Sequence, residues 1–283
     1  MHVTRLVLRR APTVPLEAEC ITPDVLDGLR NAEIRALPVF HGKRQYRLDD
    51  FFDVEGDGSA EIHLEGDLHR VRWVGHRMTH GRIVIHGNIG MHLGASMQGG
   101  TVEVYGHAGD WVGAEMTGGR IWIHGNAGNQ VGAAYRGSPA GMQGGVILID
   151  GSAGIELGMR MYRGVIAVRG PVGDFAGLHM RGGTLVLLNA VGIRTGAWMV
   201  RGTVLTFRPP ALLPTFLYAC TYRPTFLILY IRYLEQLGFT LPDTARSCVF
   251  HRYVGDTAVP GKGEILVAEP KPQEHRTTVQ REV

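Results

Sequence analysis

The chain has 283 residues and a formal net charge of +3, with 19% charged and 45% hydrophobic residues, a composition that predicts a folded protein. The charge is too weak, and basic runs are too scarce, for a nucleic-acid-binding module. The longest apolar run, FLILYI at 226–231, is far shorter than the ~20 residues that a membrane span needs. The N-terminus lacks the apolar core of a signal peptide, and we therefore expect a cytoplasmic protein with no nucleic-acid or membrane partner.

The three cysteines, Cys20, Cys220 and Cys248, are far apart in the chain. No CxxC or Cys/His spacing occurs, so neither a zinc knuckle nor a disulfide framework is indicated. We expect the three thiols to be reduced.

Residues 1–57 are predicted to form an N-terminal extension with a short strand and short helices. The run VTRLVLRR (3–10) is typical of a strand. At Thr22-Pro23 we expect a helix with threonine as its cap and proline in its first turn, and Asn31 is the expected cap of a second helix. LDDFFDV (48–54) leads into the next region.

A glycine-rich repeat occupies residues 58–207 and accounts for the forty glycines, about twice the usual share. Successive repeats begin 19 residues apart, except for one step of 26 that carries an insertion around RGSPAG (136–141). The starting positions are Gly81, Gly100, Gly119, Gly145, Gly164, Gly183 and Gly202. Methionines keep the same interval, at Met78, Met97, Met116, Met142, Met161, Met180 and Met199. Self-similarity at a fixed period is the signature of a solenoid.

Each repeat contains one short strand in which the second and fourth residues after the starting glycine are apolar. The pairs are Ile83/Ile85, Val102/Val104, Ile121/Ile123, Ile147/Ile149, Ile166/Val168 and Leu185/Leu187. Period-two alternation places both residues of a pair on one face, which so small a unit can bury only by stacking on its neighbours. We therefore predict an all-β fold, a right-handed parallel β-helix of 19-residue coils with the methionines stacked inside. About seven coils spaced by roughly 4.8 Å give a stack about 35 Å long.

Further glycines recur in each repeat, and we expect them to form the corners of the coil. The stretch GNAGNQVG (125–132) looks like a phosphate-binding loop, but such a loop needs its glycines once, in front of a helix. Recurrence in every repeat favours corners with φ > 0 over nucleotide binding. The columns are Gly87, Gly106, Gly125, Gly151 and Gly170; Gly90, Gly109, Gly128, Gly154, Gly173 and Gly192; and Gly94, Gly113, Gly132, Gly158, Gly177 and Gly196. Asn189 replaces glycine in the first column, and asparagine tolerates the left-handed region.

The two ends of the repeat region differ from its middle. Residues 61–78 fit the pattern incompletely and are predicted to cap the first coil. Residues 208–283 are predicted to form a C-terminal extension, so that small α+β segments flank the coil on both sides. Within it, PTFLILYIRYLEQL (224–237) is expected to be one apolar helix that ends at Gly238 and packs on the solenoid or on a partner. Strand-like runs follow within 246–268, and the last fifteen residues are expected to be a frayed polar tail.

The outward-facing strand position is apolar in most repeats. The column consists of Val84, Glu103, Trp122, Leu148, Ala167, Val186 and Leu205. A contiguous apolar stripe marks an interface, so we expect the C-terminal helix, another protein or both to cover it. Such a column is unsuited to acid–base chemistry. A free-standing β-helix enzyme acting on a polysaccharide, which needs a charged groove, is the alternative from another class of protein.

Two sets of polar residues are candidates for a site. His86, Tyr105 and His124 occupy equivalent positions, followed by Asp150 and Arg169. Histidines can bind metal, but the tyrosine interrupts the column and we expect no carboxylate column beside it, which favours a surface ladder. Arg136, Arg163, Arg181 and Arg201 lie along one edge, where they could attract an anionic ligand or an acidic partner, although solvated arginines are favoured. We assign no catalytic, cofactor-binding or metal-binding residue to this chain.

The repeat GxxxxxGxxGxxxGxxMxGG over residues 61–207 resembles the glycine-rich solenoid shared by the C-terminal domain of glutamate synthase large chains and the C subunit of formylmethanofuran dehydrogenase. The flanks are similar to the second family. LDGLRNAEIRALPV (26–39) and LDDFFDVEG (48–56) resemble its lead-in. LGFTLPDTARSCVFHRYVGDTAVPGKGEILV (237–267) resembles the tail of its bacterial branch, the C subunit of the formyltransferase/hydrolase complex of methylotrophic bacteria.

The resemblance implies a role in one-carbon metabolism, within formaldehyde oxidation. In that branch the complex moves a formyl group from formyl-tetrahydromethanopterin onto a methanofuran analogue and hydrolyses the product to formate. The implied partners are the A, B and D subunits, in a hetero-oligomer with more than one copy of each, and this chain is implied to be a non-catalytic scaffold. The methanofuran analogue, tetrahydromethanopterin and a hydrolase metal are implied for the partners, and no cofactor for this chain. The alternative within the family is the C subunit of a molybdenum or tungsten formylmethanofuran dehydrogenase.

Overall fold

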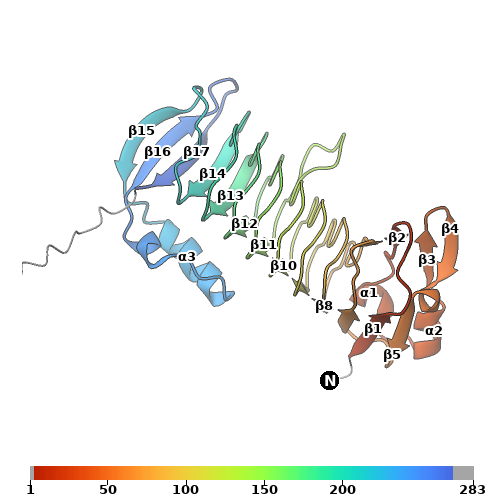
Figure 1. The fold of residues 1–283 in the computed structure, drawn as a ribbon. Coiled ribbons are helices and arrows are strands. Elements are labelled where there is room, and N and C mark those ends of the chain that lie inside the picture. Colours follow the sequence, from red (N-terminus) through yellow and green to blue (C-terminus); the bar gives the residue numbers. More distant parts are fainter. Residues whose placement is uncertain (1–2, 270–283) are drawn as a thin grey trace, which may run out of the picture.

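A computed structural model of the protein describes residues 3–269 and shows a long coil of short strands with an additional segment at each end (Figure 1). The N-terminal segment contains β1 (Thr4–Leu8), β2 (Leu16–Glu17), α1 (Pro23–Leu26), α2 (Asn31–Arg35), β3 (Pro38–His41), β4 (Arg44–Arg47), the 3-10 turn η1 (Leu48–Asp50) and β5 (Phe52–Glu55). The coil contains β6 (Glu61–Glu65), β7 (Val71–Arg72), β8 (Arg82–His86), β9 (Thr101–Val104), β10 (Arg120–Ile123), β11 (Val146–Ile149), β12 (Val165–Val168), β13 (Arg181–Leu187) and β14 (Arg201–Thr206). The C-terminal segment contains β15 (Leu217–Tyr222), α3 (Leu227–Gln236), the 3-10 turn η2 (Asp243–Arg246), β16 (Phe250–Gly255) and β17 (Gly263–Ala268).

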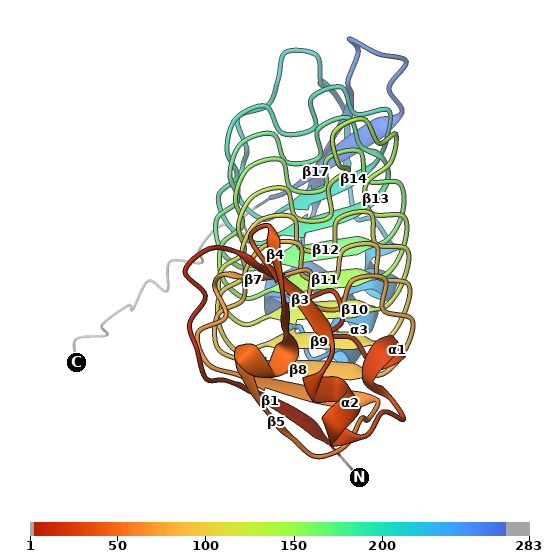
Figure 2. The same ribbon diagram turned by 90° about the vertical axis from the view of Figure 1, so that its right-hand side faces the viewer.

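Pairing between equivalent residues of successive repeats builds one large sheet. Ile121 of β10 pairs in parallel with Val102 of β9 on one side and with Ile147 of β11 on the other. The sheet has thirteen strands in the order β15-β16-β17-β14-β13-β12-β11-β10-β9-β8-β6-β1-β5. Figure 2 shows the coils stacked one behind another. The predicted β-solenoid is confirmed.

The inward residues of the strands and the methionine column form the core of the coil. Every inward strand residue of the six predicted pairs is at most 1% exposed, and all seven methionines of the column are 0% exposed. Methionine suits this position because its unbranched side chain adapts to the irregular space at a corner.

The glycine columns have two different physical causes, and the corner explanation holds for only some of them. In the third column, which contains Gly94, φ lies between 59° and 74°. The starting glycines, which the corner prediction did not include, also have positive φ, from 76° to 110°. The second column has no positive φ, so the prediction is wrong there. A Cβ on Gly128 would lie 2.8 Å from the backbone nitrogen of Asp110 and from the carbonyl carbon of Gly109, because adjacent coils approach too closely for a side chain.

The first column also departs from the prediction. Of its predicted members, only Gly87 has a positive φ. Asn189 is not in the left-handed region, so the reason proposed for it is wrong. Its side-chain oxygen instead accepts a hydrogen bond from the backbone N–H of Ala190 at 2.8 Å, a local contact of the kind that asparagine makes in turns.

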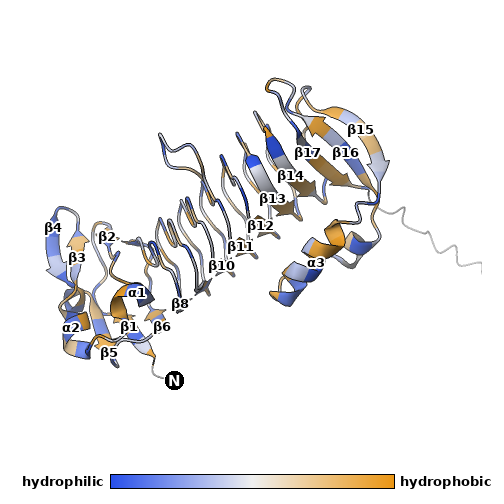
Figure 3. Cartoon of the chain, turned by 180° about the vertical axis from the view of Figure 1, so that it is seen from behind, coloured by the Kyte–Doolittle hydropathy of each residue, from blue (hydrophilic) through white to orange (hydrophobic). Residues whose placement is uncertain are grey.

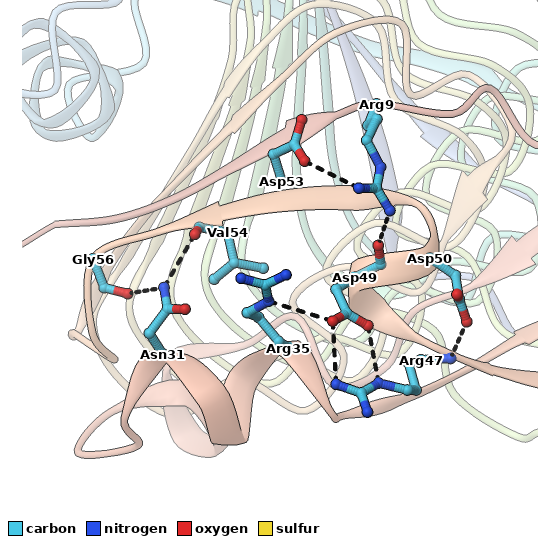
Figure 4. A network of polar contacts seen from close by, with 9 residues as sticks. All are labelled: Arg9, Asn31, Arg35, Arg47, Asp49, Asp50, Asp53, Val54 and Gly56. Carbon is cyan, nitrogen blue, oxygen red and sulfur yellow. Dashed lines mark hydrogen bonds and ion pairs between the residues drawn. The ribbon is translucent and has the colours of Figure 1, made fainter.

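Of the two predicted helix caps in the N-terminal segment, Thr22 is confirmed as the residue at the N-cap position, and Asn31 is wrong because Arg30 occupies that position. Thr22 is the N-cap residue of α1, which begins at Pro23 as expected, but its hydroxyl donates to the Asp24 carboxylate at 3.1 Å and makes no hydrogen bond to the helix backbone. Asn31 is the first residue of α2, and its side-chain amide donates to the carbonyls of Val54 and Gly56 at 3.0 and 2.8 Å (Figure 4). Asn31 therefore ties α2 to β5.

A network of charged side chains holds the same segment together (Figure 4). The Asp49 carboxylate accepts hydrogen bonds from Arg35 at 3.3 Å and from Arg47 at 3.0 Å. Arg9 pairs with Asp53 at 3.5 Å. The segment closes the first coil, because β1 pairs in parallel with β6 and antiparallel with β5.

At the C-terminal end, β17 takes the place of one more coil strand. It pairs in parallel with β14, and β16 and β15 continue the sheet antiparallel. The predicted helix is α3, followed by Gly238 with φ of 88°. From residue 270 onward, the predicted polar tail lies outside the described residues.

Candidate interaction surfaces

The outward side of the large sheet is covered in its C-terminal half by the chain's own α3. Leu148, Ala167 and Val186 are fully buried and form a second hydrophobic cluster with Leu227 and Leu234 of α3. Figure 3 shows α3 running beside this side of the stack. The predicted apolar stripe is therefore an interface within the chain, the first of the possibilities stated for it.

Trp122 lies at the margin of this covered region. Its indole N–H donates to the Asp150 carboxylate at 3.0 Å. A Cβ added to Gly238 would be 3.0 Å from the indole ring, so the end of α3 packs directly on Trp122. On the outer side of α3, Leu229 is 66% exposed and Tyr233 is 42% exposed. The helix thus covers one apolar surface and presents another.

The expected ladder of rings crosses the N-terminal half of the same sheet face. His86 and Tyr105 stack with centroids 5.7 Å apart, and Tyr105 and His124 stack at 4.8 Å. His63 extends the ladder by one coil, with its centroid 5.4 Å from that of His86. The spacing of adjacent strands, about 4.8 Å, is close to the distance at which rings stack, so a parallel solenoid readily aligns them.

Carboxylates join this ladder, contrary to expectation. His124 places Nδ1 2.8 Å from Asp150 and Nε2 3.1 Å from Glu103. Arg169 donates to Asp150 at 2.7 Å, and Arg82 donates to Glu103 at 2.9 Å. Glu103 comes from the outward strand column and Asp150 from the ladder's own column, so the contacts arise between neighbouring columns. Only the combination of the two columns could have shown them from the sequence.

The ladder is an ion-pair network. Partial burial raises the pKa of Glu103, but hydrogen bonds from His124, Arg82 and Tyr105 outweigh it and hold that pKa below its usual 4.5. Among the described side chains of residues 3–242 and 245–269, no group of three or more His, Cys, Asp or Glu is placed to hold a metal ion. The carboxylates of Glu103 and Asp150 instead bond to arginines, histidine and the indole N–H.

A second aromatic ladder, which the sequence analysis missed, lies on a different wall of the coil. Trp73 stacks on His92 with centroids 4.2 Å apart, and Trp111 stacks on Tyr135 at 4.8 Å. Trp73, His92 and Trp111 are equivalent residues of successive coils, with φ of 66°, 65° and 64°. Non-glycine residues occupy this left-handed region at some cost. The signal available in the sequence was a column of large residues two positions before each glycine of the third column.

Tyr135, which precedes the RGSPAG insertion, covers this second ladder. Its hydroxyl oxygen lies 2.8 Å from Nδ1 of His92. Burial, helped by Arg72, lowers the pKa of His92 to about 4, while burial and Glu115 raise the pKa of Tyr135. The imidazole is therefore neutral at pH 7, and its hydrogen bond with the Tyr135 hydroxyl anchors the start of the insertion.

The four arginines of the predicted edge are exposed. Arg181 and Arg201 are paired residues of β13 and β14, and Arg163 precedes β12. Arg136 lies apart from them, in the insertion. Beside the first three, Trp198 stacks on His179 with centroids 5.1 Å apart. None of the four arginines forms an ion pair with another described side chain, which excludes Asp243 and Thr244.

Three further findings concern a cavity, the cysteines and the helices. A cavity of about 290 Å3 lies between the N-terminal part of α3 and residues 245–250, with Leu227, Ile231, Cys248 and Phe250 among its lining residues. The three cysteines are free thiols, as expected. In the part of the chain that the structure describes, no helix has the length and apolar character needed to cross a membrane.

Comparisons with known proteins relate these features to a family. A family model described as the GXGXG motif matches residues 82–210. The chain is 40% identical over 95 residues to the C subunit of tungsten-containing formylmethanofuran dehydrogenase 2 from Methanothermobacter thermautotrophicus. It is 42% identical over 93 residues to the C subunit of molybdenum-containing formylmethanofuran dehydrogenase 1 from Methanosarcina barkeri. These matches cover 32% and 31% of this chain and 35% and 31% of the relatives, so they span about a third of the relatives' length.

A crystal structure matches over nearly the whole chain. One chain of the formyltransferase/hydrolase complex (FhcABCD) from Methylorubrum extorquens, solved in complex with methylofuran, has a TM-score of 0.87 and 36% sequence identity to this protein. The similarity covers 94% of this chain and 100% of that chain, and therefore includes the end segments as well as the coil. The chain belongs to the family formed by the C subunits of formylmethanofuran dehydrogenases and formyltransferase/hydrolase complexes.

Proposed function

We propose that this chain is a non-catalytic scaffold subunit of a formyltransferase/hydrolase complex. The observation that carries the proposal is the similarity over 94% of the chain to one whole chain of such a complex. The complex would transfer the formyl group of formyl-tetrahydromethanopterin to a methanofuran analogue and release formate from the product. The A, B and D subunits would contain the reactive groups, the two cofactors and the hydrolase metal.

The geometry of the chain supports a scaffold. Each coil is hydrogen-bonded to the next along the parallel sheet, so the molecule can hold partners at fixed separations. Its walls present different surfaces, namely the ion-pair ladder, the exposed side of α3 and the arginine edge. The exposed apolar residues Leu229 and Tyr233 on α3 are of the kind that a further polypeptide buries.

The finer organisation is part of the same proposal. We assign residues 58–207 to the spacer and residues 1–57 and 208–283 to the segments that close its two ends. The coil would be right-handed, because crossovers between parallel strands of one sheet have that hand in nearly all proteins. The complex would be cytoplasmic and would contain more than one copy of each of its polypeptides.

The proposal is tested by producing the tagged chain together with its partner subunits and analysing the purified complex by native mass spectrometry. We expect the chain in a defined hetero-oligomer with the A, B and D subunits. We also expect the complex, but not the isolated chain, to transfer and hydrolyse formyl groups. Formyl transfer or hydrolysis by the isolated chain at the rate of the complex would contradict the proposal.

Metal analysis of the same preparation separates the two members of the family. Stoichiometric molybdenum or tungsten would identify a formylmethanofuran dehydrogenase, because that enzyme depends on a redox metal. A monomer that cleaves a polysaccharide would place the chain in a different class of protein.

A further inference from the structure

Cations and exposed rings gather on successive coils near the C-terminal end of the stack. They flank the buried methionines Met161, Met180 and Met199, so that the methionine of each coil faces the core and the residues beside it face outward. We call this region the cationic surface and define it by Arg163, Arg181, Arg201, Lys262, Tyr162 and Trp198.

Backbone hydrogen bonds between the coils place these residues side by side. The N–H of Arg181 donates to the carbonyl of Met161 at 2.8 Å, and the N–H of Lys262 donates to that of Val200 at 2.7 Å. Arg181 and Arg201 are register partners of adjacent parallel strands. Arg181 and Arg201 therefore lie about one strand spacing, roughly 4.8 Å, apart across a register shift between β13 and β14, and like charges at that distance repel one another.

Among the side chains that the structure describes, residues 3–242 and 245–269, no carboxylate neutralises these cations. Arginines on other walls, such as Arg5, Arg82 and Arg252, each pair with a glutamate. Asp256 lies beside the cationic surface, but it is only 3% exposed, and it accepts hydrogen bonds at 2.9 Å from the backbone N–H groups of Trp198 and Ala258. The cationic surface is thus an unbalanced positive region on a protein whose net charge is only +3.

Exposed aromatic rings accompany the charge. Tyr162 is 47% exposed and Trp198 is 46% exposed. Trp198 is held in position by its stacking on His179 and by the hydrogen bond of its backbone N–H to Asp256. Rigidly held tryptophan and tyrosine next to arginine are the residues that carry most of the energy of protein–protein interfaces.

We propose that the cationic surface is the docking site for an acidic polypeptide segment of a partner subunit. This inference rests on the proposed scaffold function, because it needs a hetero-oligomer. Guanidinium groups form paired hydrogen bonds with carboxylates, and the two exposed rings offer apolar area for residues between the acids. The small net charge of the whole chain argues against a nucleic acid as the occupant.

The test is purification of the whole complex with Arg181→Glu and Arg201→Glu combined in this chain. A matched control carries Lys43→Glu and Arg44→Glu, which change the charge equally at exposed residues at the other end of the molecule. We expect the first variant to lose one partner, or to bind it about tenfold more weakly or worse, while the control keeps all partners. Raising the salt concentration should weaken the same contact in the wild-type complex.

Further measurements check that the variants fold and identify the segment that binds. Thermal unfolding of each variant shows whether it folds, and the Arg181→Gln/Arg201→Gln pair, which adds no negative charge, should give a weaker loss of the same partner. A photo-cross-linking amino acid in place of Tyr162 should link to a segment of that partner rich in Asp and Glu.

Unchanged ratios of the polypeptides in the folded Glu variant would overturn the docking inference and leave the scaffold proposal standing. So would a cross-link to RNA, or to a segment without acidic residues. Failure of the wild-type chain to bind any partner would overturn the scaffold proposal itself.

Discussion

Two stacked histidine–tryptophan pairs lie on the coil, and they differ in what covers them. Trp73 and His92 stack at an interplanar angle of 10°, and His179 and Trp198 at 12°. All four residues have positive φ, from 53° to 66°. Tyr135 covers the first pair, whereas Trp198 of the second pair remains 46% exposed.

The comparison shows how one backbone geometry supports two uses of the same rings. Where a third ring of the chain covers the pair, as Tyr135 does, burial lowers the pKa of the histidine to about 4. Where nothing in the described chain covers it, the pair is a rigid surface beside unpaired cations. The large sheet repeats this contrast, since α3 covers its C-terminal half and leaves the ion-pair ladder of the N-terminal half uncovered.

The largest predicted loss of stability comes from adding a side chain at a glycine where adjacent coils approach closely. This loss should be equal near the two ends of the coil. A Cβ on Gly109 would lie 2.9 Å from the carbonyl carbon of Gly90, and one on Gly173 would lie 2.8 Å from that of Gly154. We expect Gly109→Val and Gly173→Val each to lower the free energy of unfolding by about 3 kcal/mol, because backbone cannot move aside as a side chain can. Urea denaturation measures both. A loss of stability in only one of the two variants would show that the two halves of the coil do not tolerate an added side chain equally.

Removal of Tyr135, which covers the first pair, should cost more stability than removal of an exposed ring on the cationic surface. We expect Tyr135→Ala to lower the free energy of unfolding by about 2 kcal/mol, because it removes a half-buried ring and its hydrogen bond to His92. Tyr162→Ala, at a ring that is 47% exposed, should change it by less than about 0.5 kcal/mol. Equal losses in urea denaturation would contradict the distinction between a covered and an open surface.

Acid should destabilise the covered pair. His92 has a folded pKa of about 4 against an ordinary value of 6.5, so below pH 6.5 the unfolded chain binds a proton that the folded chain rejects. Its contribution to stability is present above pH 6.5 and is lost as the pH falls from 6.5 towards 4. The loss should be up to about 1 kcal/mol per pH unit, and His92→Phe should remove it. Urea midpoints at pH 7.5, 6 and 5 test this, and identical slopes for wild type and variant would refute it.

Trp198→Ala, like Tyr162→Ala, should have only a small effect on stability. We expect a change within about 0.5 kcal/mol, because the ring is exposed and the backbone N–H keeps its bond to Asp256. The same variant should weaken partner binding in the complex by about tenfold, as removal of an interface tryptophan does. A large loss of stability together with unchanged binding would reverse the assignment of the two pairs.

The sequence predicted the parts of the fold that periodicity encodes. Inward strand residues and methionines recur every 19 residues because each coil must bury the same positions, and the apolar helix followed from its composition. The glycines were harder, because a corner with positive φ and a close approach of two backbones both appear in a sequence as a missing side chain. Gly94 and Gly128 belong to these two different cases.

The surfaces were less predictable, because each outward-facing column of equivalent residues was considered separately and contacts between columns were not. The contacts of His124 with Glu103 and Asp150 join neighbouring columns, and the bond of Tyr135 to His92 joins residues 43 positions apart. Asn31 was misassigned for the same reason, since its partners lie on β5. Such contacts depend on how the chain is folded in space, and local patterns do not contain that information.

The regular rise from one coil to the next has a consequence for distance. Each coil adds the same rise of about 4.8 Å, so any two surfaces on the stack are separated by a whole number of steps. Gain or loss of one 19-residue unit would shift the ion-pair ladder relative to the cationic surface by one step and leave both intact. The coil is therefore a spacer on which the separation between bound proteins can change only in increments of one coil.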